Sequence, residues 1–483
     1  MEIYKVKNNY KQIDNFIDTT TEYMNYDRIK NCDFATAYFY IDEDPNILNA
    51  ADMIDGIYVK DTITEDFIKL NKEQENNSRF NVIKNIVDNI QSYCSIYNSQ
   101  NNKLILKRLN NDTRKSYLDG TSSVDDIIDT TNERDVWVGL SMPVCYKVEP
   151  FNKIVNNNVY PRYRVTITTK SMQLTNGWQQ YKPYTLIGVY KASLRNNKLY
   201  SISGVIPAKG ELDYKTFVSN RGANFKLIDY KTHQFIALLA FGYYKTVDVT
   251  KICGDGTTTY VGDTFYPKLT GLTNDYGNND TTPDNGSSLN PTDADIIKGY
   301  GDDIVSINCL GIENIYGDIY EQMGDIFKKQ KSYIVTYLNN NTSKSIDITH
   351  SDGSYNTYNH TNCDTLNDYL YLCIMDKDNN ILRAIGMNNQ FVELGNIFNL
   401  IFGLYGDIIP KTKINDYGIR YSNMGYIDDT REELYRAGAT FLNWTQATGF
   451  VTLGTVNKNA GNWSTCVGTR IMYEGNTDTI EIQ

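Results

Sequence analysis

The chain of 483 residues is long enough for roughly three domains, and its 41% hydrophobic and 22% charged residues are ordinary for a globular protein. Its 39 tyrosines and 12% share of aromatic residues exclude the aromatic-poor, disordered class. The net charge of −11, without a cluster of Lys and Arg, argues against a nucleic-acid-binding surface. The longest apolar stretch, residues 235–241, is far below the ~20 residues of a membrane span, and the N-terminus lacks the pattern of a signal peptide. We therefore expect a soluble protein that is not secreted through a signal peptide.

The eight cysteines and three histidines offer little for metal or redox chemistry. No two cysteines have CxxC spacing, so a zinc ribbon or a thioredoxin-like site is not expected, and buried free thiols are favoured over disulfides. Only His350 and His360 are close in sequence, and the polar stretch between them is typical of a loop or hairpin. The sequence thus predicts no metal site and no cofactor.

The first sixty residues predict a small, separate element of strands and loops. Residues 34–41 form a short aromatic and β-branched run, and acidic turn residues follow it at positions 42–45. After Asp61 the pattern changes to that of a helix, because Thr62 or Thr64 can serve as the N-cap and Glu65 follows in the first turn.

Residues 80–97 carry apolar side chains in the 3-4-3-4-3 spacing of a coiled-coil seam: Phe80, Ile83, Val87, Ile90, Cys94 and Tyr97. One amphipathic helix lying on its own domain would show the same spacing, so both interpretations stay open. In the first, residues 61–100 form a helical neck, and Phe80, Ile83, Val87 and Ile90 hold two or three copies of the chain together. The β-branched seam favours three strands, although Cys94 and Tyr97 blur that preference.

From about residue 103 onward the chain predicts an irregular β-rich fold. Short β-branched or aromatic runs, bounded by Asn, Asp, Gly or Pro, occur at residues 104–106, 136–138, 163–169 and 185–191. Two helices are predicted among them, at residues 229–244 and 312–328, each with apolar residues at helical spacing. Residues 271–291 are dense in Asn, Asp, Thr and Gly and predict a long surface loop. No fixed-period repeat is present, which disfavours a β-helix spike, and the predicted fold class is α+β.

Five blocks of this region, taken in order, resemble those of bacteriophage virion proteins with a C-type-lectin-like domain. They are LILKRLN (104–110) with YLDGT (117–121), DVWV (135–138) and MP (142–143); IGVYKA (187–192) with LYSISG (199–204); RG (221–222) with the helix that follows; GIENIYGDIYE (311–321); and GATF (438–441) with GF (449–450) and VGTR (467–470). The resemblance covers about residues 103–475. It implies a large C-type-lectin-like domain that follows an N-terminal virion-attachment element, residues 1–60.

The same fold is shared with formylglycine-generating enzymes, whose Gly-Asn-aromatic-x-Glu block resembles residues 317–321. Here Asp318 stands in place of the Asn, and Tyr320 in place of the usual Trp. Those enzymes need two cysteines beside the substrate groove, because copper-thiolate oxidation uses two soft ligands, and this chain has only Cys466 in its terminal region. We therefore do not expect an enzyme of that type.

In related phage lectin domains the terminal segment presents the residues that face the ligand. The resemblance implies the same role here for its aromatic and amide side chains, which suit sugar rings and hydroxyls: Asn443, Trp444, Asn459, Asn462 and Trp463. A Trp beside a strand can equally be a core residue. The acidic sets at residues 302–303 and 428–433 lack the ligand spacing of a calcium loop and are typical of solvated turns.

The sequence thus predicts a structural protein of a bacteriophage virion, located in the virion as a head or tail fibre. It would bind host-surface or mucosal glycans, contact other capsid or tail proteins through its N-terminal region, and self-associate as a dimer or trimer. A composition heavy in Asn, Ile, Lys and Tyr suits an A/T-rich genome, as in crAss-like phages, and the head-fibre interpretation is favoured because long repetitive shaft segments are absent. The alternative is a glycan-degrading tailspike enzyme with two opposed carboxylates in a groove.

Overall fold

The computed structural model describes residues 30–42, 54–278 with short gaps, 306–329 and 467–483, and separate strands between residues 332 and 454. In this part of the chain, sheets dominate and a few short helices accompany them, so the predicted α+β class is confirmed. No helix among these residues has both the length and the apolar character needed to cross a lipid bilayer.

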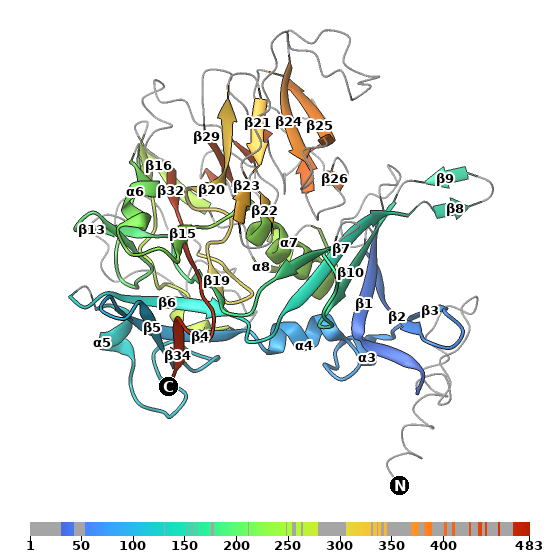
Figure 1. Ribbon diagram of the computed structural model, residues 1–483, viewed down its shortest axis with the longest axis horizontal. Helices are drawn as coiled ribbons and strands as arrows, with labels where there is room; N and C mark the ends of the chain where they lie inside the picture. Colours follow the sequence, from blue (N-terminus) through green and yellow to red (C-terminus); the bar gives the residue numbers. More distant parts are fainter. Residues whose placement is uncertain are drawn as a thin grey trace.

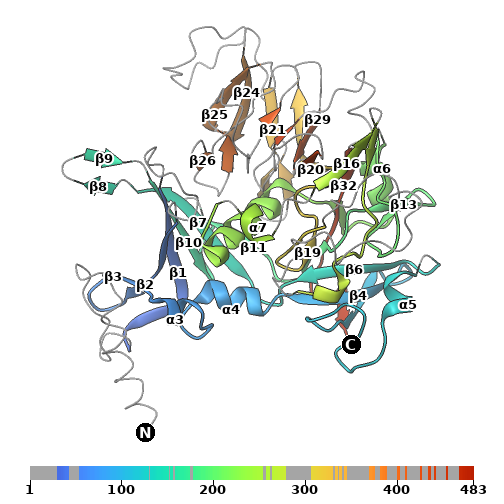
Figure 2. The same ribbon diagram turned by 180° about the vertical axis from the view of Figure 1, so that it is seen from behind.

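Three larger sheets surround one central helix, α7 (Tyr230–Tyr244) (Figures 1 and 2). The first is a six-stranded antiparallel sheet, drawn at the right of Figure 1, with the order β11 (Gln179–Tyr181), β7 (Val144–Pro150), β10 (Arg162–Thr168), β1 (Cys32–Asp42), β2 (Ile54–Asp61) and β3 (Phe67–Lys69). Strand β1 pairs with β10 from Thr36↔Thr168 to Asp42↔Arg162. The N-terminal strand is therefore an inner strand of this sheet.

The second sheet has seven strands and lies at the lower left of Figure 1. Its order is β15 (Phe225–Leu227), β33 (Ile471–Glu474), β12 (Thr185–Gly188), β6 (Arg134–Gly139), β4 (Gln91–Asn98), β5 (Lys103–Arg108) and β34 (Ile480–Ile482). All neighbours are antiparallel except β5 and β34, which run parallel. This sheet joins the C-terminus to strands from the first third of the chain.

The third sheet, with eight strands, lies above α7 in Figure 1. It contains β25 (Ile381–Asn388), β24 (Tyr369–Met375), β21 (Ser332–Val335), β20 (Tyr320–Lys329), β29 (Glu433–Arg436), β31 (Leu453–Gly454) and β28 (Gly425–Tyr426) in this order, with β32 (Val467–Thr469) parallel to β20.

Smaller ladders complete the described strands. A three-stranded ladder joins β17 (Thr264–Tyr266), β16 (Thr257–Val261) and β30 (Thr440–Phe441). The two-stranded ladders are β8 (Lys153–Val155) with β9 (Asn158–Tyr160), β13 (Ser193–Arg195) with β14 (Lys198–Tyr200), β18 (Asn308–Cys309) with β19 (Ile312–Glu313), β22 (Tyr337–Asn339) with β23 (Thr342–Lys344), and β26 (Leu400–Phe402) with β27 (Ile408–Pro410).

Helix α7 forms where the sequence predicts it. The Asp229 side chain accepts a hydrogen bond from the Thr232 backbone N–H at 2.7 Å, which is an N-cap, and the helix ends at Lys245 in the left-handed conformation. Its apolar side chains are buried on most sides, including Phe235, Ile236, Leu238 and Phe241. The helix is therefore the centre of the main core cluster, as its sequence predicts.

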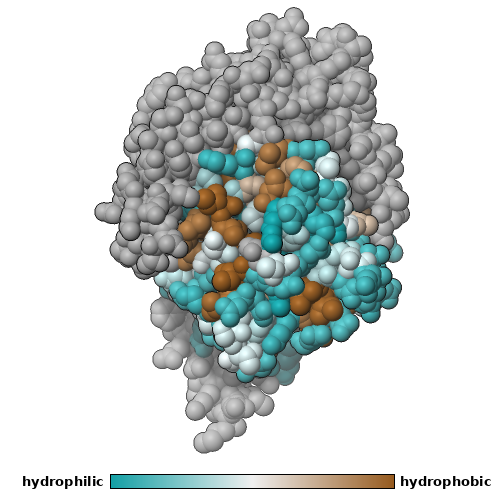
Figure 3. Space-filling view, turned by 90° about the vertical axis from the view of Figure 1, so that its left-hand side faces the viewer, coloured by the Kyte–Doolittle hydropathy of each residue, from teal (hydrophilic) through white to brown (hydrophobic). Residues whose placement is uncertain are grey.

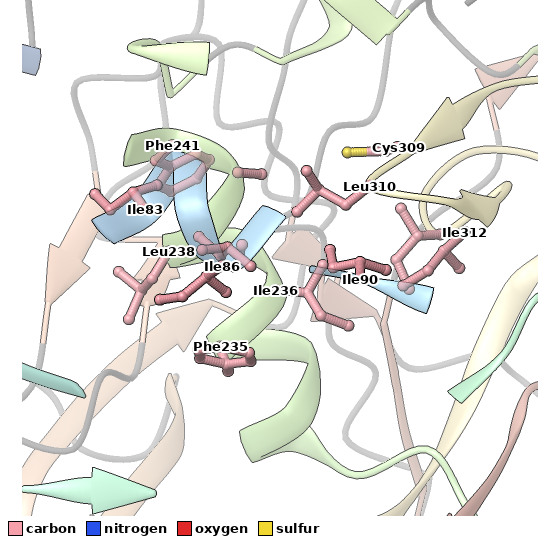
Figure 4. Close-up of a cluster of buried hydrophobic side chains, with 14 of the residues drawn as sticks. Ile83, Ile86, Ile90, Phe235, Ile236, Leu238, Phe241, Cys309, Leu310 and Ile312 are labelled. Atoms are coloured by element: carbon pink, nitrogen blue, oxygen red, sulfur yellow. The ribbon is translucent and has the colours of Figure 1, made fainter. Parts of the chain in front are cut away.

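The other described helices are short: α3 (Lys72–Glu75), α4 (Val82–Asp88), α5 (Val124–Ile127), α6 (Tyr214–Ser219), α8 (Thr250–Cys253) and a 3₁₀ turn, η2 (Asn274–Tyr276). Helix α4 packs on α7 with Ile83 and Ile86, and Ile90 follows it into the same cluster (Figure 4). A side-chain carbon at Gly242 of α7 would stand 2.8 Å from both Ile83 and Phe39, so this close approach requires glycine.

The helical neck predicted for residues 61–100 is wrong. Asn71 caps the four-residue α3, α4 ends at Asn89, and residues 91–98 are the strand β4 between β5 and β6. Of the predicted seam, Ile83 and Ile90 are buried inside this chain, while Phe80 and Val87 are half-buried. A seam between copies cannot use side chains that the chain's own core encloses, and self-association itself stays a prediction.

The predicted boundaries also need correction, because strands on both sides of residues 60 and 100 share sheets. Strands β1 and β2 belong with β7 and β10, and β4 lies in the middle of the seven-stranded sheet. The predicted separate element of residues 1–60 is thus wrong for its described strands. Residues 1–29 lie outside the described residues.

Two further predictions of local structure are wrong. Residues 312–328 form β19 and β20 in place of a helix, because Asn314, Gly317 and Asp318 adopt positive φ angles that a helix excludes. The first part of the predicted surface loop at 271–291 is only partly exposed, since Thr273 and Asn274 are buried. The remainder, from residue 279, lies outside the described residues. The prediction of buried free thiols is confirmed for Cys94, Cys145, Cys253 and Cys309, while Cys32 is a free thiol that is half-buried.

Candidate functional site

The predicted glycan-binding residues, Asn443, Trp444, Asn459, Asn462 and Trp463, lie outside the described residues. Within that segment the structure gives only β30, which runs parallel to β16, and β31. The functional groups that can be placed are two buried sets of charges and one polar pocket on the surface.

The first buried set joins three predicted blocks through the carboxylate of Glu321. Its Oε1 accepts hydrogen bonds from Lys191 Nζ at 2.9 Å and from Arg470 Nε at 2.9 Å, and all three side chains are at most 1% exposed. Arg470 also donates to the backbone carbonyls of Gly188 and Val189, at 2.8 and 2.7 Å. Lys191 follows β12, Glu321 lies on β20, and Arg470 separates β32 from β33.

Burial governs the electrostatics of this set. Desolvation lowers the pKa of Lys191, and the nearby Glu321 carboxylate opposes that shift. Desolvation also lowers the pKa of the adjacent, fully buried Lys268 to about 8, against the attraction of Asp318 and Glu313. The Glu313 carboxylate accepts backbone hydrogen bonds from Gly271 and Thr273 at 2.8 Å, yet burial still raises its pKa.

The second buried set joins Asp135 of β6 to Arg221. Asp135 Oδ2 and Arg221 Nη2 are 2.6 Å apart, and neither side chain is exposed. The other carboxylate oxygen accepts the Ser201 backbone N–H at 2.8 Å. Burial raises the pKa of Asp135, and the Arg221 guanidinium counters part of that rise. The guanidinium also stacks on the rings of Tyr200 and Phe225, 4.0 and 4.5 Å from their centroids.

These enclosed charges are placed to hold strands together, since none of them faces solvent. Arg114 shows the same arrangement without a hydrogen-bonded carboxylate, because it donates to the carbonyls of Gly277 and Gly311 and to Ser92 Oγ. Among the described residues, no group of three or more His, Cys, Asp or Glu side chains could hold a metal ion. The absence of a metal site stays a prediction.

The polar pocket lies between the loop that follows α5 and the β13–β14 hairpin, with a volume of about 140 Å³. Figure 1 places both elements at its left edge, and Figure 3 looks onto that side, where separate groups of hydrophobic residues stand among hydrophilic ones. The lining is mainly charged and amide side chains over Tyr200 and Ile202: Asp129, Thr131, Asn132, Glu133, Arg195, Asn196 and Lys198.

Most charges of the pocket are already paired. Asp129 accepts hydrogen bonds from Thr131, Asn132 and Arg134. Burial works against the ionised form, but the hydrogen bonds from Thr131 and Asn132 outweigh it and hold the pKa of Asp129 well below its usual range. Glu133 and Lys198 form an ion pair with each other. The turn between the strands places Asn196 and Asn197 at φ angles of 49° and 57°, as a tight type I′ hairpin requires.

The sequence interpretation missed this pocket, although one signal for it was present. The Asn-Asn pair at 196–197 stands between the runs Ser193–Arg195 and Lys198–Tyr200, which is a hairpin pattern. Sequence alone does not show that residues 129–133 lie against this hairpin. No protein-family model and no curated protein sequence matches this chain.

Proposed function

We propose that this protein is a structural component of a bacteriophage virion, a head or tail fibre with a C-type-lectin-like domain that binds host-surface or mucosal glycans. The proposal rests on the sequence blocks at residues 104–121, 135–138, 187–204, 221–222, 311–321 and 467–470. The finer fold, a C-type-lectin-like domain over about residues 103–475, is part of the same proposal.

The observation that carries the proposal is that buried ion pairs link these blocks to one another. Glu321 of one block contacts Lys191 and Arg470 of two others. Asp135 and Arg221 likewise join two further blocks. The resemblance concerns each block separately, so contacts among the charged residues of different blocks are independent support for one common fold.

The cost of an unpaired buried charge explains why the charged residues of different blocks would be retained as partners. Removing one partner of a fully buried pair leaves an uncompensated charge, at a cost of about 3 to 5 kcal/mol. A chain that keeps Glu321 in its block must therefore keep a cation in contact with it. The enclosed position of these groups favours a scaffold that presents surface loops over a catalytic centre built from the same charges.

In this role the protein would be located in the virion and would contact capsid or tail proteins through its N-terminal region. Because β1 and β2 belong to the six-stranded sheet, we place the attachment segment in the residues that precede β1. Assembly as a homodimer or homotrimer is part of the proposal, through a surface other than the seam at residues 80–97.

The experiment is to locate the protein on purified particles of the phage that encodes it, by cryo-EM or by immunogold labelling. We expect copies at a fixed position on the capsid or the tail. Absence from purified particles, together with abundance in infected cells, would overturn the fibre proposal. Incubation of the protein with capsular or mucin glycans distinguishes the rival, because a tailspike enzyme releases sugars and a fibre does not.

A further inference from the structure

The lining of the polar pocket includes one cationic side chain that has no ion-pair partner among the described residues. Its acidic groups are engaged, Asp129 with Arg134 and Glu133 with Lys198. The side chain of the half-buried Arg195 makes no ion pair or hydrogen bond with the described part of the chain. Arg134 is itself shared between Asp126 and Asp129, so Arg195 is the charged side chain of the lining without an ion-pair partner among the described residues.

The hairpin fixes the backbone that carries this cation. Arg195 ends β13, and its backbone pairs with Lys198 across the two-residue turn. The Asn220 side-chain amide donates to the Asn197 carbonyl at 2.8 Å, which ties the turn to the end of α6. A guanidinium on a fixed backbone loses less freedom on binding than one on a mobile loop.

The remaining lining suits hydroxyl groups around a small apolar surface. Asn196 can donate and accept hydrogen bonds, whereas the Thr131 hydroxyl and the Asn132 amide nitrogen already donate to Asp129 and offer a ligand only their acceptor oxygens. Ile202 and Tyr200 contribute carbon atoms to the lining. A volume of about 140 Å³ lies below the roughly 300 to 1,000 Å³ of pockets for drug-sized ligands. The pocket thus fits one small, hydroxyl-rich unit with a negative charge.

We propose that this pocket binds an acidic sugar unit, a carboxylate-bearing monosaccharide such as a hexuronate within a glycan. The planar guanidinium of Arg195 pairs with the carboxylate, and Asn196 and Thr131 bind ring hydroxyls. The choice of a sugar rests on the proposed glycan-binding function. The choice of an acidic one rests on the uncommitted charge, and the site is separate from the predicted residues at 443–463.

The test is a titration of the full chain with methyl β-glucuronide and with methyl β-glucoside, followed by ligand-observed NMR. The two sugars differ only in the carboxylate. We expect the glucuronide to bind at least tenfold more tightly, with an affinity that falls as salt rises, because the contact is between charges. Equal binding of the two sugars, or binding of neither, would overturn the proposal.

Two variants assign the binding to this pocket. Arg195→Gln should weaken glucuronide binding about tenfold or more and so remove most of the preference for the glucuronide over the glucoside. Asn196→Asp keeps a residue that tolerates the left-handed turn and adds a negative charge, so it should weaken glucuronide binding severalfold. Asn197→Asp is the matched control, since it makes the same change one residue outside the lining and should weaken binding less than Asn196→Asp does.

Unchanged melting temperatures would show that the variants are folded. If Asn196→Asp and Asn197→Asp bind glucuronide alike, the ligand lies elsewhere and the proposal fails. If acetate binds as tightly as the glucuronide, the pocket recognises a carboxylate alone, as on an acidic peptide, and the sugar assignment fails. Failure to bind the sugar by a protein present in virions would overturn this inference only, whereas binding by a protein absent from virions would overturn the fibre proposal only.

Discussion

The six-stranded and seven-stranded sheets use the same kinds of charged residue in opposite ways. Around the seven-stranded sheet, the pairs Asp135–Arg221 and Glu321–Arg470 are completely enclosed. On the outward face of the six-stranded sheet, Arg164 pairs with Glu149 while both side chains are 21% exposed. Arg164 also lies over the Phe67 and Phe151 rings, 5.0 and 5.1 Å from their centroids.

This difference shows that access to water determines how much stability is lost when an ion pair is broken. Partial exposure lets water take over when a pair on the six-stranded sheet is broken, so each such pair contributes little on its own. Water cannot replace the partner of an enclosed charge. Removing that partner therefore lowers the stability strongly, although the intact pair adds little net stability. The seven-stranded region should therefore tolerate substitution of its charges far less than the six-stranded region.

The largest expected effect is on Arg470. Arg470→Met removes the hydrogen bonds to Glu321 and leaves several backbone carbonyls without their donor. Glu321 keeps Lys191 as a partner, so the main cost is that of buried carbonyls left without a donor. We expect a loss of about 3 to 5 kcal/mol in the free energy of unfolding, measured by urea denaturation. Arg470→Lys should recover only part of it, because an ammonium group cannot reach all of these acceptors.

The matched control is Lys226→Met on the same sheet. Lys226 pairs with Glu474, but its side chain is 39% exposed. We expect this change to cost at most about 1 kcal/mol. If Arg470→Met and Lys226→Met lower the stability equally, the contrast between enclosed and exposed pairs is not real.

Local signals made parts of the fold predictable from the sequence. Helix α7 has both an N-cap at Asp229 and apolar side chains on most sides, and strands such as β6 and β10 are short β-branched or aromatic runs between turn residues. The helix predicted for residues 312–328 was wrong because Ile315, Ile319 and Met323 are buried as one face of a helix would be, while residues with positive φ angles interrupt the backbone between them. Apolar spacing reports burial and leaves the backbone conformation open.

The charged sets and the pocket were less predictable, because they join residues far apart in the chain. Arg470 and Glu321 are separated by 149 residues, and Arg221 and Asp135 by 86. Nothing in either local segment specifies its partner. The same limit applies to the pocket, which depends on the packing of residues 129–133 against the β13–β14 hairpin.

Replacing Lys268 should have a smaller effect on stability, and this effect should depend on pH. Its pKa is about 8 in the folded protein, against about 10.4 in an unfolded chain. Between these values the unfolded state binds more protons, so the stability contributed by Lys268 rises with pH, is complete above about 10.4, and is lost as the pH falls through 8. The stability difference between the wild type and Lys268→Met should therefore shift by about 1 to 3 kcal/mol in favour of the wild type from pH 8 to 10.5.

Urea denaturation at several pH values measures this shift. The exposed Lys226→Met serves again as the control, and its difference from the wild type should stay nearly constant over the same range. A constant difference for Lys268→Met as well would mean that Lys268 titrates as an ordinary solvated lysine, and the enclosed character of this region would then be overstated.

The smallest expected effect is on the six-stranded sheet. Arg164→Gln removes the ion pair with Glu149 and the contacts with the Phe67 and Phe151 rings. Because this face is partly solvated, we expect a loss of about 1 to 2 kcal/mol, part of which disappears in 1 M salt as the charge attraction is screened. The control is Lys170→Gln. Lys170 follows β10 and pairs with Asp33 of β1 at 2.7 Å, but its side chain is 52% exposed, so the change should cost less than about 1 kcal/mol. A loss for Arg164→Gln as large as that for Arg470→Met would mean that stacking on aromatic rings desolvates the guanidinium as fully as enclosure does, and the two sheets would then differ in geometry alone.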